Sequence, residues 1–231
     1  MLKIENTEVM GWEHAIRGMR NPMNSWDKSD SFCIDGGMFD GCQECSDRMR
    51  CAYRYGEGSR YRSDGYIGPN DLDLMTRLRN AGTDHRKFMR MITVYLDITA
   101  PLYWWKEYDT YKVGTVANSC STMHKIHDKE FTLDDFSHEH LIVSDDVNHI
   151  DMVAWLQEQI DVLNEWRRTF LDVKNSEVSS ESAKRYWWQM IQLLPSSYNQ
   201  RRTVMLNYEV LANMYKSRRN HKLDEWHTFC D

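Results

Sequence analysis

Three polar side chains near the end of the chain, Asn207, Asn213 and Arg218, are of types suited to binding a polar ligand. Leu194-Pro195 and two serines precede them, and this turn-forming segment separates them from the preceding part of the chain. From about residue 200 to residue 217 the sequence is permissive for helix throughout, so it predicts one uninterrupted helix.

One face of that helix combines polar ends with an apolar middle. Residues spaced at i, i+3, i+4, i+7 and i+11 share a helix face, and here they are Asn207, Val210, Leu211, Met214 and Arg218. The face therefore carries an amide at one end and a guanidinium at the other. Two interpretations remain open, a core-facing helix with polar ends and a helix that presents hydrogen-bonding groups to a ligand.

A cysteine cluster is the second group that could carry chemistry. Of the six cysteines, four lie close together, at Cys33, Cys42, Cys45 and Cys51. Cys42-x-x-Cys45 with two flanking cysteines could supply four thiolates to a structural Zn²⁺, although the outer spacings match no standard zinc ribbon or finger. The alternative is a set of reduced, unliganded thiols, because no secretory segment favours disulfides.

Size and charge exclude several classes of function. The chain has 231 residues and a net charge of −6, so we expect no broad electrostatic binding to a nucleic acid polymer. No apolar run approaches the ~20 residues of a membrane span, and the first residues lack the apolar segment of a signal peptide. These observations predict a cytoplasmic protein without membrane partners.

The elements expected along the chain alternate strands and helices. Ile92, Val94, Leu96 and Ile98 alternate with polar residues, which is typical of a half-buried strand over about residues 91–99, and Pro101 should end its pairing. The other expected elements are a strand over 2–9, helices over 11–20, 70–81, 102–113, 148–172 and 182–194, and a polar loop over 114–128. The pattern predicts an α+β fold, a single domain over residues 1–231 with a small, mainly antiparallel sheet flanked by long helices. A Cys-rich insertion or loop covers about residues 31–69.

This order of elements and several short motifs resemble the flavin-dependent thymidylate synthases over about residues 70–226. The strand ending in Ala100-Pro101, the Asn-x-x-Ser of Asn118 and Ser121, and the Leu194-Pro195 turn followed by two asparagines and an arginine carry the resemblance. An acidic-Trp patch follows at 224–226.

The chain departs from the family pattern at its cationic positions. Where the family has Arg-His-Arg, this chain has Thr110-Tyr111-Lys112, and the arginine of the family's polar loop is replaced by Met123. Lysine carries the positive charge but lacks the bidentate fork of arginine.

The resemblance implies a function and a set of site residues. It implies one-carbon transfer to C5 of a pyrimidine deoxynucleotide, dUMP to dTMP or a related modification, by a homotetramer that uses FAD, with NADPH and methylenetetrahydrofolate as co-substrates. The residues implied to bind cofactor are Asn207, Asn213, Arg218 and Asn118, and those implied to bind substrate are Ser121, Lys112 and Tyr111. It assigns no catalytic nucleophile.

Two other functions remain open. The replaced Arg-His-Arg motif favours a non-catalytic nucleotide-binding or interaction protein on the same scaffold. The cysteine cluster alone suggests a zinc-stabilised interaction module.

Overall fold

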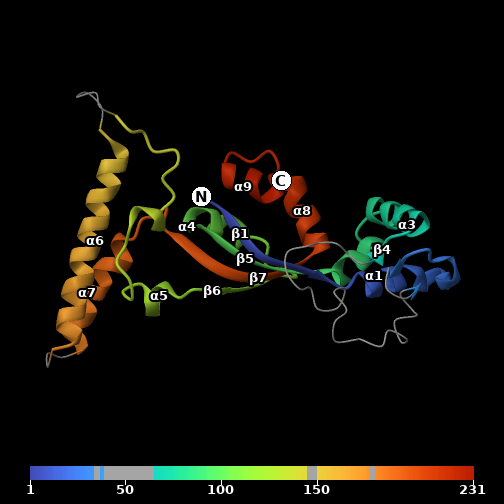
Figure 1. Ribbon diagram of the computed structural model, residues 1–231, viewed down its shortest axis with the longest axis horizontal. Coiled ribbons are helices and arrows are strands. Elements are labelled where there is room, and N and C mark those ends of the chain that lie inside the picture. The colour runs from blue at the N-terminus through green and yellow to red at the C-terminus, as the bar shows by residue number, and fades with distance from the viewer. Residues whose placement is uncertain (34–36, 39–64, 145–149, 177–179) are drawn as a thin grey trace. The chain divides into compact units, whose positions relative to one another are not determined.

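The computed structural model describes residues 1–33, 37–38, 65–144, 150–176 and 180–231 (Figure 1). The fold is α+β with a four-stranded antiparallel sheet, which confirms the predicted fold class. In chain order the strands and helices are β1 (Lys3–Met10), α1 (Trp12–Arg20), β2 (Phe32–Cys33), β3 (Gly37–Met38), β4 (Gly65–Tyr66), α3 (Pro69–Asn80), β5 (Thr93–Pro101), α4 (Leu102–Tyr108), β6 (Val116–Ser119), α5 (Thr122–Lys125), α6 (Met152–Lys174), α7 (Ser180–Leu193), β7 (Asn199–Asn207), α8 (Tyr208–Arg218) and α9 (Asp224–Cys230). Within these ranges no helix is both long and apolar enough to cross a membrane.

The four-stranded sheet has the order β1-β5-β7-β6, so β5 and β7 are its inner strands. Val94, Leu96 and Ile98 are buried in β5 while Tyr95 between them is exposed, as the alternating pattern predicted. The strand runs to Pro101, beyond which α4 begins. A smaller sheet has the order β3-β2-β4, and both of its strand pairs are antiparallel.

The prediction of one helix over residues 200–217 is wrong in its first half. Residues up to Asn207 form β7, and only Tyr208–Arg218 is helical. Gln200, Val204 and Leu206 are buried at even spacing, which is the period of a strand. Sheet pairing has overridden local helix propensity here, and Asn207 lies outside the helix face on which we had placed it.

Two further expected elements differ in extent. The helix expected over 102–113 ends at Tyr108, and the segment expected to be a polar loop contains the short β6 and α5. β6 is an edge strand with all four residues exposed, so it has no apolar alternation from which to predict it.

The described chain divides into two compact units, each assembled from several segments. Unit 1 comprises Met1–Lys3, Ile98–Thr110 and Asn118–Arg202, and unit 2 comprises Ile4–Asp97, Tyr111–Ala117 and Thr203–Asp231.

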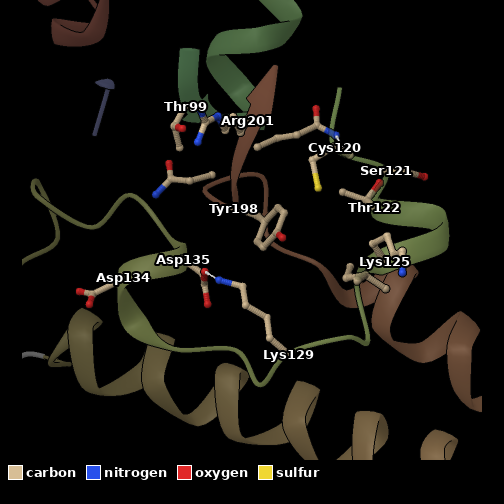
Figure 2. A pocket seen from close by; sticks show the side chains of 13 residues that line it. Thr99, Cys120, Ser121, Thr122, Lys125, Lys129, Asp134, Asp135, Tyr198 and Arg201 are labelled. Atoms are coloured by element: carbon tan, nitrogen blue, oxygen red, sulfur yellow. Dashed lines mark hydrogen bonds and ion pairs between the residues drawn. The ribbon is translucent and has the colours of Figure 1, made fainter. Parts of the chain in front are cut away.

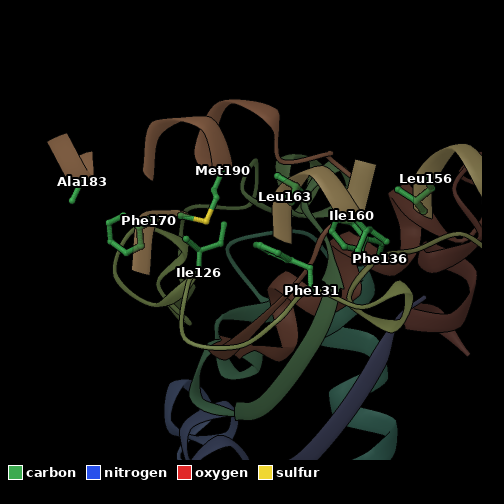
Figure 3. Close-up of a cluster of buried hydrophobic side chains, with 9 residues drawn as sticks. All are labelled: Ile126, Phe131, Phe136, Leu156, Ile160, Leu163, Phe170, Ala183 and Met190. Carbon is green, nitrogen blue, oxygen red and sulfur yellow. The ribbon is translucent and has the colours of Figure 1, made fainter. Parts of the chain in front are cut away.

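Helices α6 and α7 pack side by side in unit 1 and cover its apolar core (Figures 1 and 3). The buried members of this core are Ile126, Phe131, Phe136, Leu156, Ile160, Leu163, Phe170, Ala183 and Met190. Asp151 caps α6 by accepting hydrogen bonds from the main-chain nitrogens of Val153 and Ala154, both at 2.9 Å.

A buried amide fixes the loop that crosses this core. The side chain of Asn164 on α6 exchanges two hydrogen bonds with the main chain of Phe131, accepting from its nitrogen at 2.8 Å and donating to its oxygen at 2.9 Å. Because both polar ends of the buried amide are satisfied, the loop around Phe131 has one preferred position on α6.

A buried carboxylate organises the start of α3 in unit 2. Asp71 is fully buried and accepts hydrogen bonds from Arg20 Nε at 2.6 Å, Ser29 Oγ at 2.7 Å and Ser31 Oγ at 2.6 Å. Burial raises the pKa of the Asp71 carboxyl group, but the hydrogen bonds from Ser31, Ser29 and Arg20 outweigh it and hold the pKa below its ordinary value.

We predict that Asp71→Asn lowers the free energy of unfolding by about 3–5 kcal/mol, because it leaves the buried Arg20 without its counter-charge. Urea unfolding followed by tryptophan fluorescence measures this. The matched control is Asp73→Asn, since Asp73 lies on the same helix in an exposed pair with Arg77, and its loss should cost less than about 1 kcal/mol.

The difference in unfolding free energy between the wild-type protein and Asp71→Asn should depend on pH. A lowered folded-state pKa contributes stability above the unfolded pKa, about 3.9, and that contribution is lost as the pH falls through the folded value. The difference should therefore be complete at neutral pH and shrink below about pH 4. A difference that is the same at pH 7 and pH 3 would contradict the assignment.

Candidate functional site

A cavity of about 250 Å³ in unit 1 is one of two candidate sites (Figure 2). Its lining comes from the start of β7, the segment through α5, and the loop before the isolated bridge at Phe136. The lining residues are Thr99, Cys120, Ser121, Thr122, Lys125, Ile126, Lys129, Asp134, Asp135, Tyr198, Asn199, Gln200 and Arg201.

Hydrogen bonds hold the walls of this cavity together. Gln200 is buried, donates to the main-chain oxygen of Cys120 at 2.9 Å and accepts from Arg202 Nε at 3.0 Å. The main-chain nitrogen of Cys120 donates to the oxygen of Arg201 at 2.9 Å. Ser121 caps α5 by accepting from the nitrogen of His124 at 3.2 Å. The segment around Cys120 is thus attached to β7 by side-chain and main-chain bonds.

Ion pairs neutralise much of the charge around the cavity. Lys129 is paired with Asp135, whose carboxylate also caps the turn that begins at Thr132. Lys125 is paired with Asp128 at 2.8 Å, and this hydrogen bond holds the pKa of Asp128 below its ordinary value. The lysines therefore add little net charge to the lining.

Tyr198 places an aromatic ring in the middle of the lining (Figure 2). Its ring packs edge-on against Phe136 and Phe131, with centroids 5.6 and 6.2 Å away. Burial, with smaller contributions from the charges of Asp135 and Cys120, raises the pKa of the Tyr198 hydroxyl to about 12. At neutral pH this hydroxyl is therefore protonated and can donate a hydrogen bond.

The second candidate site, in unit 2, surrounds the guanidinium of Arg218. Arg218 Nε donates to the hydroxyl of Tyr111 at 3.0 Å. The guanidinium lies 5.0 Å from the ring centroid of Trp226 and 5.5 Å from that of Tyr111. Two residues implied by the resemblance, Tyr111 and Arg218, are thus in direct contact, and the buried Trp226 of the acidic-Trp patch completes the arrangement.

Asn207 has a structural role at the junction of β7 and α8. Its side-chain oxygen accepts from the main-chain nitrogen of Val210 at 3.1 Å and so caps α8. Gly114, with φ +76°, lies so close that an added Cβ would be 2.7 Å from Asn207 Nδ2. Only glycine permits this approach of the loop to the amide.

The remaining expected site residues lie on the surface. Lys112, Asn118 and Asn213 are exposed, and Asn118 does not line the cavity. In unit 1 the structure therefore places only Ser121 at the cavity. The predicted zinc ligands Cys42, Cys45 and Cys51 lie outside the described residues, as does the side chain of Cys33.

Sequence reasoning missed the part of the cavity formed by residues 198–201, because these were assigned to a turn and a helix. The available signals were the even spacing of the apolar residues Val204 and Leu206, and Asn207 as a helix-capping residue that ends the strand.

We predict that Asn207→Ala lowers the free energy of unfolding by about 1 kcal/mol, because the nitrogen of Val210 loses its acceptor. Asn207→Asp keeps an acceptor at the start of α8 and should retain wild-type stability. Urea unfolding measures both. Asn213→Ala, at an exposed interior position of the same helix, is the control and should cost nothing. Equal stability of Asn207→Ala and wild type would show that the cap contributes nothing.

Comparisons with known proteins show the fold. No model of a known protein family and no curated protein matches the sequence. The structure is similar to that of thymidylate synthase ThyX from Helicobacter pylori, solved with FAD and dUMP, with a TM-score of 0.57, 15% identity, and coverage of 100% of this chain and 90% of that chain. A UMP/dUMP methylase, PolB from Streptomyces cacaoi, solved with 5-Br UMP, gives a TM-score of 0.51, 13% identity, and coverage of 97% and 79%. The chain therefore has the fold of the flavin-dependent thymidylate synthases over its whole length.

Proposed function

We propose that this protein is a divergent flavin-dependent thymidylate synthase-like enzyme that binds FAD and transfers a one-carbon unit to C5 of a pyrimidine deoxynucleotide. The observation that carries the proposal is the likeness of fold over the whole chain to proteins solved with dUMP or 5-Br UMP. These neighbours support a role in modifying nucleotides.

The residues of unit 2 fit a phosphate-bearing planar cofactor. Asn207 uses its side-chain oxygen as a helix cap, which leaves its amide hydrogens directed elsewhere, beside the bare Cα of Gly114. Lys112 follows Tyr111 and is exposed, and Arg218 is held against Tyr111 and Trp226. An amide donor, two cations and the partly exposed ring of Tyr111 suit the pyrophosphate and the rings of FAD.

The proposed roles of the chain's residues follow from their chemistry. A bound reduced flavin supplies the hydride that completes the transferred one-carbon unit. Arg218 and Lys112 balance phosphate charge, and Tyr111 orients Arg218 through its hydroxyl. Asn207 and Asn213 donate hydrogen bonds to the cofactor, and Ser121 donates to the nucleotide; the cofactor contact of Asn118 that the resemblance implies stays a prediction.

One observation favours the second candidate function, a nucleotide-binding protein that does not catalyse. Tyr111 stands where the family has the histidine of Arg-His-Arg, and it engages Arg218 within the chain. A guanidinium that is already hydrogen-bonded and stacked can bind a ligand without reaching a reacting atom. Turnover separates the two functions.

The homotetramer implied by the resemblance stays a prediction, which sedimentation velocity tests.

We predict that the purified protein binds FAD, seen as a shifted flavin absorption spectrum and quenched flavin fluorescence, and that dUMP perturbs this spectrum further. With NADPH and methylenetetrahydrofolate, dTMP or another C5-modified nucleotide should form, measured by mass spectrometry. Binding of both ligands without product would favour the non-catalytic function. Absence of FAD binding would remove the redox mechanism.

We predict that Arg218→Lys weakens FAD binding about tenfold, because lysine loses the bidentate fork, and that Lys112→Ala weakens it less. Lys216→Ala is the matched control, an exposed cation on the last turn of α8, and should bind FAD as the wild type does. If Arg218→Lys and Lys216→Ala bind FAD equally well, Arg218 is not a cofactor-binding residue.

A further inference from the structure

His127 follows the short helix α5 and lies against the last turns of α6, within unit 1. Its ring packs edge-on against Phe170, with centroids 4.8 Å apart, and only 14% of the side chain is exposed. Arg167 Nε donates to the main-chain oxygen of His127 at 2.9 Å, and Arg167 Nη2 donates to that of Asp128 at 3.3 Å. The main chain beside the ring is therefore attached to α6 without the use of the ring nitrogens.

A lysine determines the protonation state of this ring. Lys174 Nζ lies 3.3 Å from His127 Nε2, and an ammonium group can only donate. Nε2 therefore accepts, which makes the ring neutral and places its single proton on Nδ1. Nδ1 is inaccessible to solvent and has no hydrogen-bond partner among the described residues. A second proton can enter only at Nε2, where it abolishes the bond from Lys174.

A carboxylate beside the ring can accept a hydrogen bond from its protonated form. Asp128 Oδ1 lies 3.6 Å from His127 Nε2, while Asp128 Oδ2 is paired with Lys125 Nζ at 2.8 Å. Once Nε2 carries a proton, it can donate to Oδ1, and one carboxylate then serves two cations. Asp128 no longer neutralises Lys125 completely, and Lys125 lines the cavity of unit 1 (Figure 2).

The surrounding charges set the direction of the change with pH. Burial lowers the pKa of the His127 ring, and the positive charges on α6, first Lys174 and then Arg167, lower it further. In the segment of the ring itself, Lys125 also lowers this pKa, whereas Asp128 raises it. The other charged or titratable residues of α5 and of α7, which packs against α6, are exposed, namely His124, Glu181, Lys184 and Arg185. The ring is therefore neutral at pH 7 and takes up a proton only below its unperturbed value of about 6.5.

We infer that His127 is an acid-sensing switch for the cavity of unit 1. On taking up a proton at Nε2, the ring releases Lys174 and draws Asp128 away from Lys125. The lining, close to neutral at pH 7, then gains positive charge and favours anionic groups. The switch needs neither flavin nor nucleotide, so failure of the proposed function would leave it intact.

The charge of a small alkylating reagent tests the switch at Cys120, an exposed thiol in the lining. The pKa of Lys125 is raised chiefly by the hydrogen bond and charge of Asp128 and more weakly by the charge of Cys120, so the thiol senses this lysine. Iodoacetate is anionic and iodoacetamide is neutral, and both react with the same thiolate, so the ratio of their rates reports local charge. As the pH falls from about 8 to about 5, this ratio at Cys120 should rise about twofold, as expected for one unit charge nearby in water. Peptide mass spectrometry measures the ratio, and Cys230, in unit 2, is the internal reference.

Protonation of His127 itself is followed by deuterium exchange of its C2 hydrogen, read by mass spectrometry at a series of pH values. The midpoint should lie below that of the same peptide in the urea-unfolded protein and should coincide with the rise in the alkylation ratio. Lys174→Met should move both transitions to higher pH, because a cation beside the ring is removed. Lys184→Met removes an exposed lysine of α7 and is the control, which should leave both transitions in place.

His127→Gln removes the titrating ring and should abolish the rise at Cys120. If this variant does not fold, the coincidence of the two wild-type transitions and their joint shift in Lys174→Met decide the question. A constant ratio in the wild type overturns the inference, as does a His127 midpoint at or above that of the unfolded protein. An equal rise in His127→Gln also overturns it and assigns the effect to another group, such as His124. Coincident transitions in a protein that binds no FAD would sustain the switch and reject the flavin mechanism.

Discussion

Buried side-chain amides hold unit 1 together, and the cavity depends on them. Asn164 fastens the loop at Phe131 to α6, and Gln200 fastens the segment at Cys120 to β7. Each amide has both its donor and its acceptor satisfied by the main chain or by a neighbouring side chain, so each specifies one arrangement of two segments rather than a general attraction. Apolar packing between α6 and α7 supplies burial, but it does not determine where these loops lie. Against this background, Asn199 is an exception, because no hydrogen-bond partner of its Nδ2 lies among the described residues.

The sequence predicted those helices and strands whose apolar residues repeat regularly within the element itself. The alternation in β5 and the long amphipathic segments of α6 and α7 could be recognised in the sequence, because each of these elements buries one regular face. β7 could not be recognised in this way, because Gln200, Arg202 and Thr203 interrupt its apolar residues and the segment contains no residue that breaks a helix. What makes it a strand is pairing with β5, a partner about a hundred residues away, and no window of sequence contains that information.

The candidate sites, too, could be predicted from the sequence only in part. The resemblance singled out Tyr111, Asn207 and Arg218 from the sequence, and the structure brings Tyr111 and Arg218 into contact. The capping role of Asn207 required knowledge of where the strand ends. The cavity lining from Tyr198 to Arg201 was missed, because the signals for β7 were assigned to a helix and because the lining is complete only when the loop at Phe131 is attached to α6. The zinc interpretation concerns residues outside the described ranges and stays a prediction.

The order of strands in the main sheet also determines when this protein can fold. β7 is an inner strand between β5 and β6, yet it is synthesised more than a hundred residues after β5, as the bond between Thr203 and Asp97 across 106 positions illustrates. Until β7 has left the ribosome, β5 has an unpaired inner edge and β6 has no neighbour in the sheet. Contacts between residues so far apart are formed late and slowly, because a long loop must close before they contribute. From the synthesis of β5 until that of β7, the nascent chain therefore has an unpaired strand edge, and such edges favour aggregation.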